Sequence, residues 1–346
     1  MEIKKIRVLV VDDSILFREV LSRGLASDPS IEVIATAGDP YEARDKILQF
    51  HPDVMTCDVE MPKMNGLEFI RKLLPQYPLP VIMVSAVNGI VFDAMHAGAV
   101  DFVIKPDLKS VHSVENFLID MITKVKVASA AKVRLRLPEE LRRAEGTVDT
   151  QTMKQLIAIG ASTGGTEAIY QVLKGLPVNI PGIVIVQHIP RDFSRMFAER
   201  MNSALPLEVK EASSGDMVKS GRVLIAPGDQ HMRLLKTGEG YKVECYHGEK
   251  VNGHCPSVDV LFESVARVAG ENAIGIILTG MGYDGAKGLL AMKRRNARTL
   301  GQDEETSVVY GMPKVSFHLG AVDQQLPLNQ IAPALCSLLS KHTSPQ

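Results

Sequence analysis

Five polar or charged side chains within the first 105 residues follow short apolar runs. They are Asp12, Asp13, Asp58, Ser85 and Lys105. Clustered carboxylates repel one another and raise each other's pKa unless a cation is present. A hard cation such as Mg²⁺ suits oxygen ligands of this kind. A carboxylate beside Mg²⁺ and a lysine is also well placed to attack a phosphoryl group, because both cations neutralise the transferred oxygens.

Asp13 taken alone has a simpler role. An acidic residue next to Ser14 would stabilise the N-terminus of a helix that begins there. This role accounts for one residue, whereas the whole set occurs in the order expected of successive strand ends. We therefore predict a site for Mg²⁺ and a phosphoryl group, with Asp12, Asp13 and Asp58 around the metal.

A second group, in the C-terminal half of the chain, contains a serine, a histidine and an aspartate. Ser162 lies on a sharp glycine-rich turn after an apolar run, where backbone N–H groups stay open near a helix N-terminus. Serine needs a base such as His188 to take its proton, and the histidine needs a carboxylate such as Asp284 to fix its tautomer. The pattern predicts a serine hydrolase. Backbone N–H groups near Thr163 or Met281 would form its oxyanion hole, in which one donor is worth about 3–4 kcal/mol.

The same three residues are also compatible with roles outside catalysis. A glycine-rich turn after a strand also binds phosphate or a nucleotide, Asp284 could cap a helix, and a histidine at a strand end is often structural. The segment Gly160–Gly164 also fits the pattern G-x-S-x-G, in which the histidine follows the acid. That order would require His318, whose surroundings are less typical of a strand, so we prefer His188 as the base.

A metal site is an alternative interpretation of the region 245–255. Its candidate ligands are Cys245, His247, His254 and Cys255. Their spacing matches no common zinc pattern, and two of them are neighbours in the sequence. We therefore expect hydrolysis at Ser162 to need no cofactor.

Two blocks of alternating strand and helix patterns must position these groups. In the first block, the runs typical of buried strands are Ile6–Val11, Ile31–Thr36, Val54–Cys57, Pro80–Val84 and Val100–Ile104. Helical patterns lie between them, for example at Ile15–Ala26 and Tyr41–Phe50. This alternation indicates a five-stranded parallel sheet covered on both faces, and sites in such sheets lie beyond the carboxyl ends of the strands.

A second block of the same kind begins near residue 156. Its strand-like runs are Leu156–Gly160, Gly182–Gln187, Arg222–Ala226 and Ala273–Leu278. Irregular strand patterns around Met232–Cys245 suggest a hairpin. Because Ser162, His188 and Asp284 follow three of these runs, parallel strands would bring them to one edge of a sheet.

Composition limits the possible classes of protein. The chain has 346 residues, enough for two domains, and a net charge of −1, which gives no reason to expect nucleic-acid binding. Between the blocks, Lys124–Lys154 holds eight Lys or Arg and four Asp or Glu, which is typical of a solvated, partly helical linker. No apolar stretch reaches the ~18–20 residues of a membrane span, and the start does not read as a signal peptide. The four cysteines lack paired spacing, which indicates reduced thiols and a cytoplasmic location.

Residues 4–122 resemble the receiver domain of bacterial response regulators. The segments that carry this resemblance are VDDS, DVEMPKMNG, VSA and DFVIKP. The resemblance implies a five-stranded, flavodoxin-like α/β fold in which Asp58 accepts the phosphoryl group and Asp12 and Asp13 bind Mg²⁺.

The same resemblance implies three switch residues. Ser85 would be the switch hydroxyl, Lys105 the amine that pairs with the phosphate, and Phe102 the aromatic switch residue. A place in the core accounts for Phe102 equally well. The segment from Ser85 to Lys105 is a few residues shorter than is usual in the chemotaxis family, which affects the fourth helix.

Segments spread over residues 155–340 resemble the catalytic domain of the chemotaxis protein-glutamate methylesterases. They are IGASTGGTEAI, VIVQHIP, LIAPGDQHM, VNGHCPSVDVLF, GIILTGMGYDGAKGLLAM and VVYGMP. The resemblance implies a Rossmann-like, doubly wound and mostly parallel sheet, with Ser162, His188 and Asp284 as a catalytic triad.

The second resemblance also bears on the surroundings of that triad. It implies that His254 lies near the active site. Cys255 stands where the family leads us to expect an arginine, which would alter substrate contacts. Asp229 and His231 are expected to shape the cleft without a chemical role.

Taken together, the resemblances imply a receiver over 1–123, a linker over 124–154 and a methylesterase domain over 155–346. The implied enzyme is a phosphorylation-activated serine hydrolase that demethylates, and also deamidates, glutamyl and glutaminyl residues of chemoreceptors. Its phosphoryl donor would be the chemotaxis histidine kinase, with no nucleic acid as a partner and no membrane insertion. The alternative is a receiver whose output domain binds a ligand or DNA without catalysis.

Overall fold

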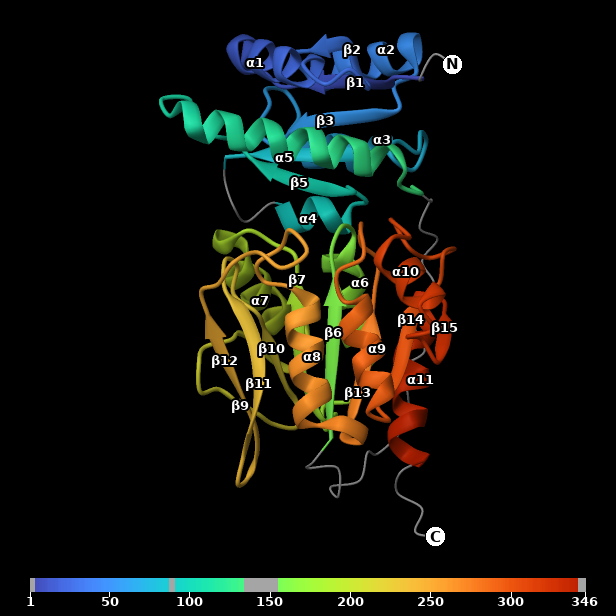
Figure 1. Cartoon of the computed structure of the whole chain (residues 1–346). Coiled ribbons are helices and arrows are strands. Elements are labelled where there is room, and N and C mark those ends of the chain that lie inside the picture. Colours follow the sequence, from blue (N-terminus) through green and yellow to red (C-terminus); the bar gives the residue numbers. More distant parts are fainter. Residues whose placement is uncertain (1–3, 87–90, 134–154, 342–346) are drawn as a thin grey trace. The chain divides into compact units, whose positions relative to one another are not determined.

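The structure, a computed structural model, describes residues 4–86, 91–133 and 155–341. These residues form two compact units, one before residue 134 and one after residue 154 (Figure 1). Most of the predicted linker therefore lies outside the described residues, and so does part of the short segment between Ser85 and Lys105.

The first unit is built on a five-stranded sheet in the order β2-β1-β3-β4-β5. Its strands are β1 Ile6–Val11, β2 Ile31–Ala37, β3 Val54–Asp58, β4 Val81–Ser85 and β5 Asp101–Ile104. All four pairings are parallel, which confirms the predicted flavodoxin-like sheet. The strand order reverses between β1 and β3, so a crevice is expected at the carboxyl ends of these two strands.

Helices follow the strands of the first sheet. They are α1 Ile15–Ala26, α2 Pro40–Phe50, α3 Gly66–Leu73, α4 Val91–His96 and α5 Val111–Ser129. Short polar residues start them: the Ser14 hydroxyl accepts from the N–H of Phe17, and the Asp39 carboxylate accepts from the N–H of Tyr41. Such caps satisfy N–H groups that have no partner within the helix. Because α5 continues to Ser129, the first residues of the predicted linker are helical.

The second unit contains a seven-stranded sheet in the order β15-β14-β13-β6-β7-β10-β8. Its strands are β6 Leu156–Ala161, β7 Gly182–Gln187, β8 Glu208–Glu211, β10 Arg222–Ile225, β13 Ala273–Ile277, β14 Arg298–Gln302 and β15 Gln324–Leu326. All six pairings are parallel, as the predicted doubly wound fold requires. The chain leaves β6 toward β7 and later returns to β13 on the other side of β6. The switch point lies between β6 and β13.

The helices of the second unit form two layers around this sheet. They are α6 Gly165–Lys174, α7 Arg191–Ala204, α8 Val258–Val268, α9 Ala286–Arg294, α10 Met312–His318 and α11 Leu328–Lys341, with a 3-10 turn at Gly270–Asn272. α9 packs against both α8 and α10, whereas α6 packs against α11 (Figure 1). Side chains such as Phe262 of α8 and Leu289 of α9 are buried in the core. None of the helices in the described parts of the chain has the length and apolar content needed to cross a bilayer.

A smaller sheet accompanies the large one. It consists of β9 Met217–Val218, β11 His231–Thr237 and β12 Gly240–Tyr246, all paired antiparallel. The predicted hairpin around Met232–Cys245 is therefore confirmed. β11 packs against α8, which places this small sheet beside the large one.

Several strands escape the sequence patterns because they are short or polar. β14 is the clearest case, since it lies inside the sheet between β13 and β15 and reads Arg-Thr-Leu-Gly-Gln. Its polar side chains Thr299 and Gln302 are fully buried. Gln302 is satisfied because its Oε1 accepts from the N–H of Thr279 at 2.8 Å and its Nε2 donates to the carbonyl of Thr306 at 2.9 Å. A pattern of apolar residues cannot reveal such a strand.

Candidate functional site

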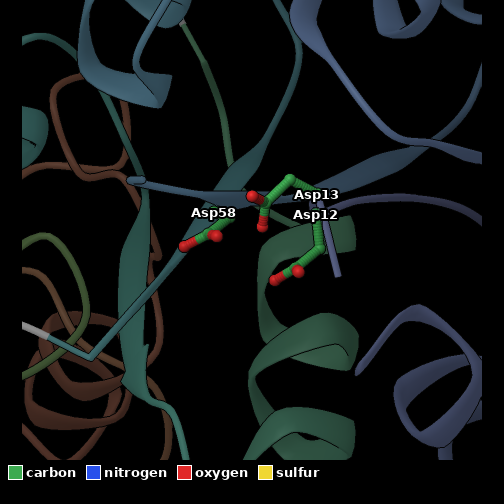
Figure 2. Close-up of side chains that lie close together, drawn as sticks. All are labelled: Asp12, Asp13 and Asp58. Atoms are coloured by element: carbon green, nitrogen blue, oxygen red, sulfur yellow. The ribbon is translucent and has the colours of Figure 1, made fainter. Parts of the chain in front are cut away.

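Three carboxylates meet at the switch point of the first sheet. Asp12 and Asp13 follow β1, and Asp58 ends the neighbouring β3 (Figure 2). Their oxygen atoms lie within 4.8 Å of one another, and Asp12 and Asp58 are buried whereas Asp13 is exposed. Among the described residues they form the one such group of possible metal ligands. The three acidic residues expected from the sequence at one sheet edge do lie close together there.

Lys105 follows β5 and reaches the same group. Its ammonium lies 2.7 Å from Asp12 Oδ2 and 2.7 Å from Asp58 Oδ2. Burial opposes the charge of the ammonium, but hydrogen bonds to Asp12 and Asp58 outweigh this effect and raise the pKa of Lys105. The amine therefore stays charged and neutralises part of the acidic cluster.

The single ammonium of Lys105 does not fully neutralise the three carboxylates. Burial raises the pKa of Asp58 from 3.8 to about 6, because the hydrogen bond from Lys105 only partly offsets burial and the nearby charge of Asp12 adds to it. Three carboxylates around one ammonium, with only oxygen ligands, fit a hard divalent cation such as Mg²⁺. These residues are therefore chemically suited to the predicted metal.

The predicted switch residues lie in the same unit. Ser85 ends β4 and is buried, and its carbonyl accepts from the N–H of Lys105 at 2.9 Å. Phe102 on β5 is also buried, with its ring centroid 6.3 Å from that of Phe92 and the Lys124 ammonium 5.2 Å from its own ring. Phe102 is thus a core residue in this structure, and its role as a switch stays a prediction.

In the second unit, Ser162 lies directly beyond β6 at the switch point. Its N–H donates to the carbonyl of Thr279, beyond β13, at 3.0 Å, and its own carbonyl accepts from Gly165 at 2.7 Å. Gly164 caps α6 with a φ of 76°, a conformation that glycine adopts without strain. A Cβ on Gly280 would come within 2.6 Å of the Ser162 Cβ, so the glycine lets the two strand ends approach closely.

His188 follows β7, the neighbour of β6. Its N–H donates to the carbonyl of Ala161 at 3.1 Å. The buried side chain of Gln187 donates from Nε2 to the carbonyls of Ser162 at 2.9 Å and His188 at 3.1 Å. One amide therefore ties the backbones of the serine and the histidine together. Gln187 was not predicted from the sequence, although it precedes His188 directly.

Asp284 and His188 form a buried pair. His188 Nε2 lies 2.9 Å from Asp284 Oδ2, and the two side chains are 8% and 1% exposed. Among the described residues, Nδ1 of the same ring is buried and has no hydrogen-bond partner. When Nε2–H donates to the carboxylate, Nδ1 carries the lone pair that can accept a proton.

Asp284 accepts five hydrogen bonds. Besides His188, the donors are Asn252 Nδ2, Ser257 Oγ and the backbone N–H groups of Val258 and Asp259 at the start of α8. Burial alone would raise the pKa of Asp284, but the hydrogen bonds from His188, Asn252 and Val258 hold it well below its usual range. Asp284 is thus a fixed anion that can orient His188 without taking its proton.

His254 stacks on His188. The ring centroids are 3.7 Å apart and the planes differ by 9°. Burial, followed by the charge of His188, lowers the pKa of His254 to about 4. His254 is therefore neutral near pH 7 and adds no positive charge beside the base, and it lies near the site as the resemblance implied.

Thr163 and Met281, the predicted oxyanion donors, lie on the two loops that flank Ser162. The carbonyl of Thr163 accepts from the Thr279 hydroxyl at 3.0 Å, which holds the turn after β6 against the end of β13. Gly280 donates to the carbonyl of Val309 at 3.0 Å, and Met281 follows it with a side chain 46% exposed. Both residues thus lie on segments at the edge of the sheet that carries Ser162, and their role as oxyanion donors stays a prediction.

His318 takes no part in the His188–Asp284 pair, whereas one of the four possible metal ligands, His254, stacks on His188. His318 ends α10 with its ring against Phe317, 6.0 Å between centroids, while Asp284 pairs with His188. The four possible metal ligands have separate partners, for example the carbonyl of Ala212 for Cys245 and that of Asp229 for His247.

His231 has a structural position. It is 2% exposed, and its Nδ1 accepts from the N–H of Ser257 at 3.2 Å while Nε2 lies 2.8 Å from the carbonyl of Glu249. It thus fastens both ends of the segment that carries Asn252 and His254. Neither Asn252 nor Ser257 was predicted from the sequence, although Asn252-Gly is a recognisable turn signal.

Comparison with known proteins assigns a family to each of the two units. A family model described as CheB methylesterase matches residues 157–335, and one described as response regulator receiver domain matches residues 8–114. The chain thus joins a receiver to a methylesterase domain. It belongs to the CheB methylesterase family.

Individual relatives extend over nearly the whole chain. A protein-glutamate methylesterase/protein-glutamine glutaminase of Syntrophomonas wolfei is 56% identical over 342 residues, which cover 99% of this chain and 100% of that protein. A protein of the same name from Salmonella typhi is 45% identical over 340 residues, with 97% of each chain covered. The crystal structure of the Thermotoga maritima CheB methylesterase catalytic domain matches with a TM-score of 0.52 and 38% identity, over 53% of this chain and 98% of that one. The predicted family, fold and enzyme class are therefore confirmed.

Proposed function

We propose that this chain is a receptor-modifying serine hydrolase in which Ser162, His188 and Asp284 form the catalytic triad. The observation that carries the proposal is the His188–Asp284 pair beside the Ser162 turn, with His188 Nδ1 buried and unpaired among the described residues. Nδ1 takes the proton of the Ser162 hydroxyl as its oxygen attacks the ester carbonyl. Asp284 stabilises the imidazolium that results.

The reaction proceeds in two balanced steps. The Ser162 oxygen bonds to the acyl carbon, and the ester C–O bond breaks as His188 returns its proton to the departing methoxide, releasing methanol. Water then attacks the acyl-enzyme with His188 as the base and releases a carboxylic acid and free Ser162. Backbone N–H groups of Thr163 and Met281 would stabilise the oxyanion, each worth about 3–4 kcal/mol.

The proposed substrates are γ-glutamyl methyl esters on chemoreceptors. The names of the relatives, protein-glutamate methylesterase and protein-glutamine glutaminase, support this substrate and add glutamine side chains as a second one. An amide passes through the same tetrahedral oxyanion, but its leaving group must be protonated. Proton donation by His188 therefore matters more for deamidation than for demethylation.

The receiver is proposed to control the hydrolase. Asp58 would accept a phosphoryl group from the chemotaxis histidine kinase, with Asp12, Asp13 and Asp58 holding Mg²⁺. When bound, the ion would neutralise the oxygens of the transferred group. Lys105 would pair with the phosphoryl oxygens, and Ser85 and Phe102 would rearrange around them. A tenfold activation needs a difference of only about 1.4 kcal/mol.

We propose the domain bounds 1–123 for the receiver, 124–154 for the linker and 155–346 for the hydrolase. The family matches at 8–114 and 157–335 support this division. The proposal includes neither nucleic acid nor a membrane as a partner.

The test is methanol release from methylated receptor membranes. Ser162→Ala and His188→Asn are expected to lower release at least about a thousandfold, because the members of a triad act as a unit. His318→Asn serves as the matched control, since His318 lies outside the proposed triad, and should release methanol normally. Loss of activity in His318→Asn with retention in His188→Asn would contradict the proposed triad.

A further inference from the structure

A short hairpin lies against both halves of the acid–base pair. Val251 and His254 exchange two backbone hydrogen bonds of 3.0 Å, and Asn252 and Gly253 between them have φ values of 53° and 83°. Positive φ at both central residues is typical of a type I′ turn, for which Asn-Gly is a preferred sequence. Local turn chemistry alone would therefore explain an asparagine at this position.

The side chain of Asn252 does more than the turn requires. Its Nδ2 donates to Asp284 Oδ1 at 2.8 Å and to Asp259 Oδ2 at 2.7 Å. Both carboxylates are buried, with 2% and 3% exposed. An uncharged NH₂ group is therefore shared between two buried acids that come from different parts of the chain, the loop before α9 and the first turn of α8.

The presence of Asp259 limits which kind of side chain can form this bridge. Burial raises the pKa of Asp259, the N–H of Gly288 opposes this, and the charge of Asp284 raises it further. The two carboxylates thus compete for the ionised state. An amide supplies one N–H to each acid without offering a titratable proton, whereas a hydroxyl has a single hydrogen to donate. Asn252 therefore allows Asp284 to stay ionised next to a second acid.

The hairpin is also held from outside. Buried His231 binds Glu249 before the hairpin and Ser257 after it, at 2.8 and 3.2 Å. The other end of the hairpin places the His254 ring 3.7 Å from the His188 ring. The same four-residue unit, 251–254, thus contacts the acid through Asn252 and the base through His254.

We infer that Asn252 is a positioning residue for the hydrolase, which holds the Asp284 carboxylate ionised and directed at His188 by bridging it to Asp259. Asn252 acts through Asp284 and does not itself contact the reacting atoms. The inference rests on the proposed triad, since it gives Asn252 a role only if Asp284 orients the catalytic base.

Two substitutions separate this role from that of the turn. Asn252→Gly keeps a sequence that favours a type I′ turn but removes the amide. Asn252→Asp also tolerates positive φ, and its carboxyl has nearly the same shape, but it can donate only while protonated. Both variants are studied in the full-length chain by methanol release from methylated receptor membranes, with the melting temperature of each variant measured alongside.

Asn252→Gly is expected to lower kcat roughly 10- to 100-fold, as for the loss of a hydrogen bond to a charged group. KM should change little, because no substrate contact is removed. A kcat equal to that of the unchanged protein, with a similar melting temperature, would overturn the inference.

Asn252→Asp supplies a readout that a purely structural residue would not affect. The titratable groups that face this position are Asp284, Asp259, His188, His254 and Lys250, with Glu263 on α8 beyond Asp259. As pH rises, the introduced carboxyl ionises among two acids and stops donating. The ratio of its kcat to that of the unchanged protein should therefore fall with increasing pH, while titration of His188 itself largely cancels in the ratio.

If Asn252→Gly folds poorly, the pH dependence of the kcat ratio for Asn252→Asp still tests the inference. A ratio for Asn252→Asp that is independent of pH would overturn the inference. Ser162→Ala in the same assay distinguishes the two proposals: if it keeps activity, the triad itself is wrong. If it is inactive while Asn252→Gly has normal kcat, only the role of Asn252 fails.

Discussion

Asp58 and Asp284 are both buried carboxylates at the switch point of a parallel sheet, yet their pKa values move in opposite directions. The pKa of Asp58 rises to about 6, whereas that of Asp284 falls well below its usual range. Asp58 shares one ammonium with Asp12, which repels it. Asp284 accepts five hydrogen bonds, two of them from the N-terminus of α8. The number of donors, and not the depth of burial, decides the direction of each shift.

The contrast matches the chemistry proposed for each site. A carboxylate such as Asp58, which has fewer donors than Asp284, keeps affinity for a cation and for an electrophilic phosphoryl group. A carboxylate whose lone pairs are all engaged is a poor base and a poor metal ligand, but it is a stable counter-ion for a histidine. The same residue type on the same kind of sheet edge would thus serve the two purposes proposed.

The largest difference between the two sites should appear when each carboxylate is replaced by an amide. Asp284→Asn is expected to lower methanol release about 10⁴-fold, as the equivalent change does in a well-studied protease, because the tautomer of His188 is then wrong. Asp58→Asn should leave basal release close to that of the unchanged protein. A similar loss in both variants would break the distinction between the two sites.

A smaller effect is expected on stability without Mg²⁺. Since the pKa of Asp58 is about 6 in the folded chain against 3.8 for the free side chain, the folded state binds more protons between these values. Stability should therefore fall as pH rises from about 4 to 6, by up to about 3 kcal/mol, and the loss is complete above pH 6. Asp58→Asn removes this penalty. The melting temperature of the variant should therefore increase relative to that of the unchanged protein as pH rises.

Thermal unfolding in a chelator, repeated with saturating Mg²⁺, measures this difference. The ion should reduce the gain, because it compensates the charge of Asp58 in the unchanged protein. A difference in melting temperature that does not vary with pH would show that Asp58 is already compensated, as Asp284 is.

The smallest expected effect is on regulation. Asp58→Ala should retain basal methanol release and lose the response to a small phosphodonor, on the order of tenfold or about 1.4 kcal/mol. Asp45→Ala, which removes an exposed carboxylate of α2, is the control and should respond normally. An unchanged response in Asp58→Ala would show that the acceptor lies elsewhere.

Much of both sites followed from strand ends. Asp12, Asp58, Ser162 and His188 come directly after apolar runs, and a parallel sheet must collect such residues at one edge. Their grouping could be predicted because strand direction follows from the alternation with helices. The sequence did not reveal β14, because this interior strand carries polar side chains and has no apolar pattern. Its position inside the sheet is possible because the side chain of Gln302 is hydrogen-bonded in the folded chain.

The sequence by itself determined which reactive residues stand at the sheet edges and to which family the chain belongs. Only the tertiary structure decided how Asp284 is held, which nitrogen of His188 it engages, and that Asn252 and His254 reach the pair from one hairpin. The physical reason is that these contacts join residues that are far apart in the sequence. Periodicity and turn chemistry report on neighbouring residues, whereas Asn252 and Asp284 are 32 residues apart, and their hydrogen bond exists only once α8 and the loop before α9 have packed together.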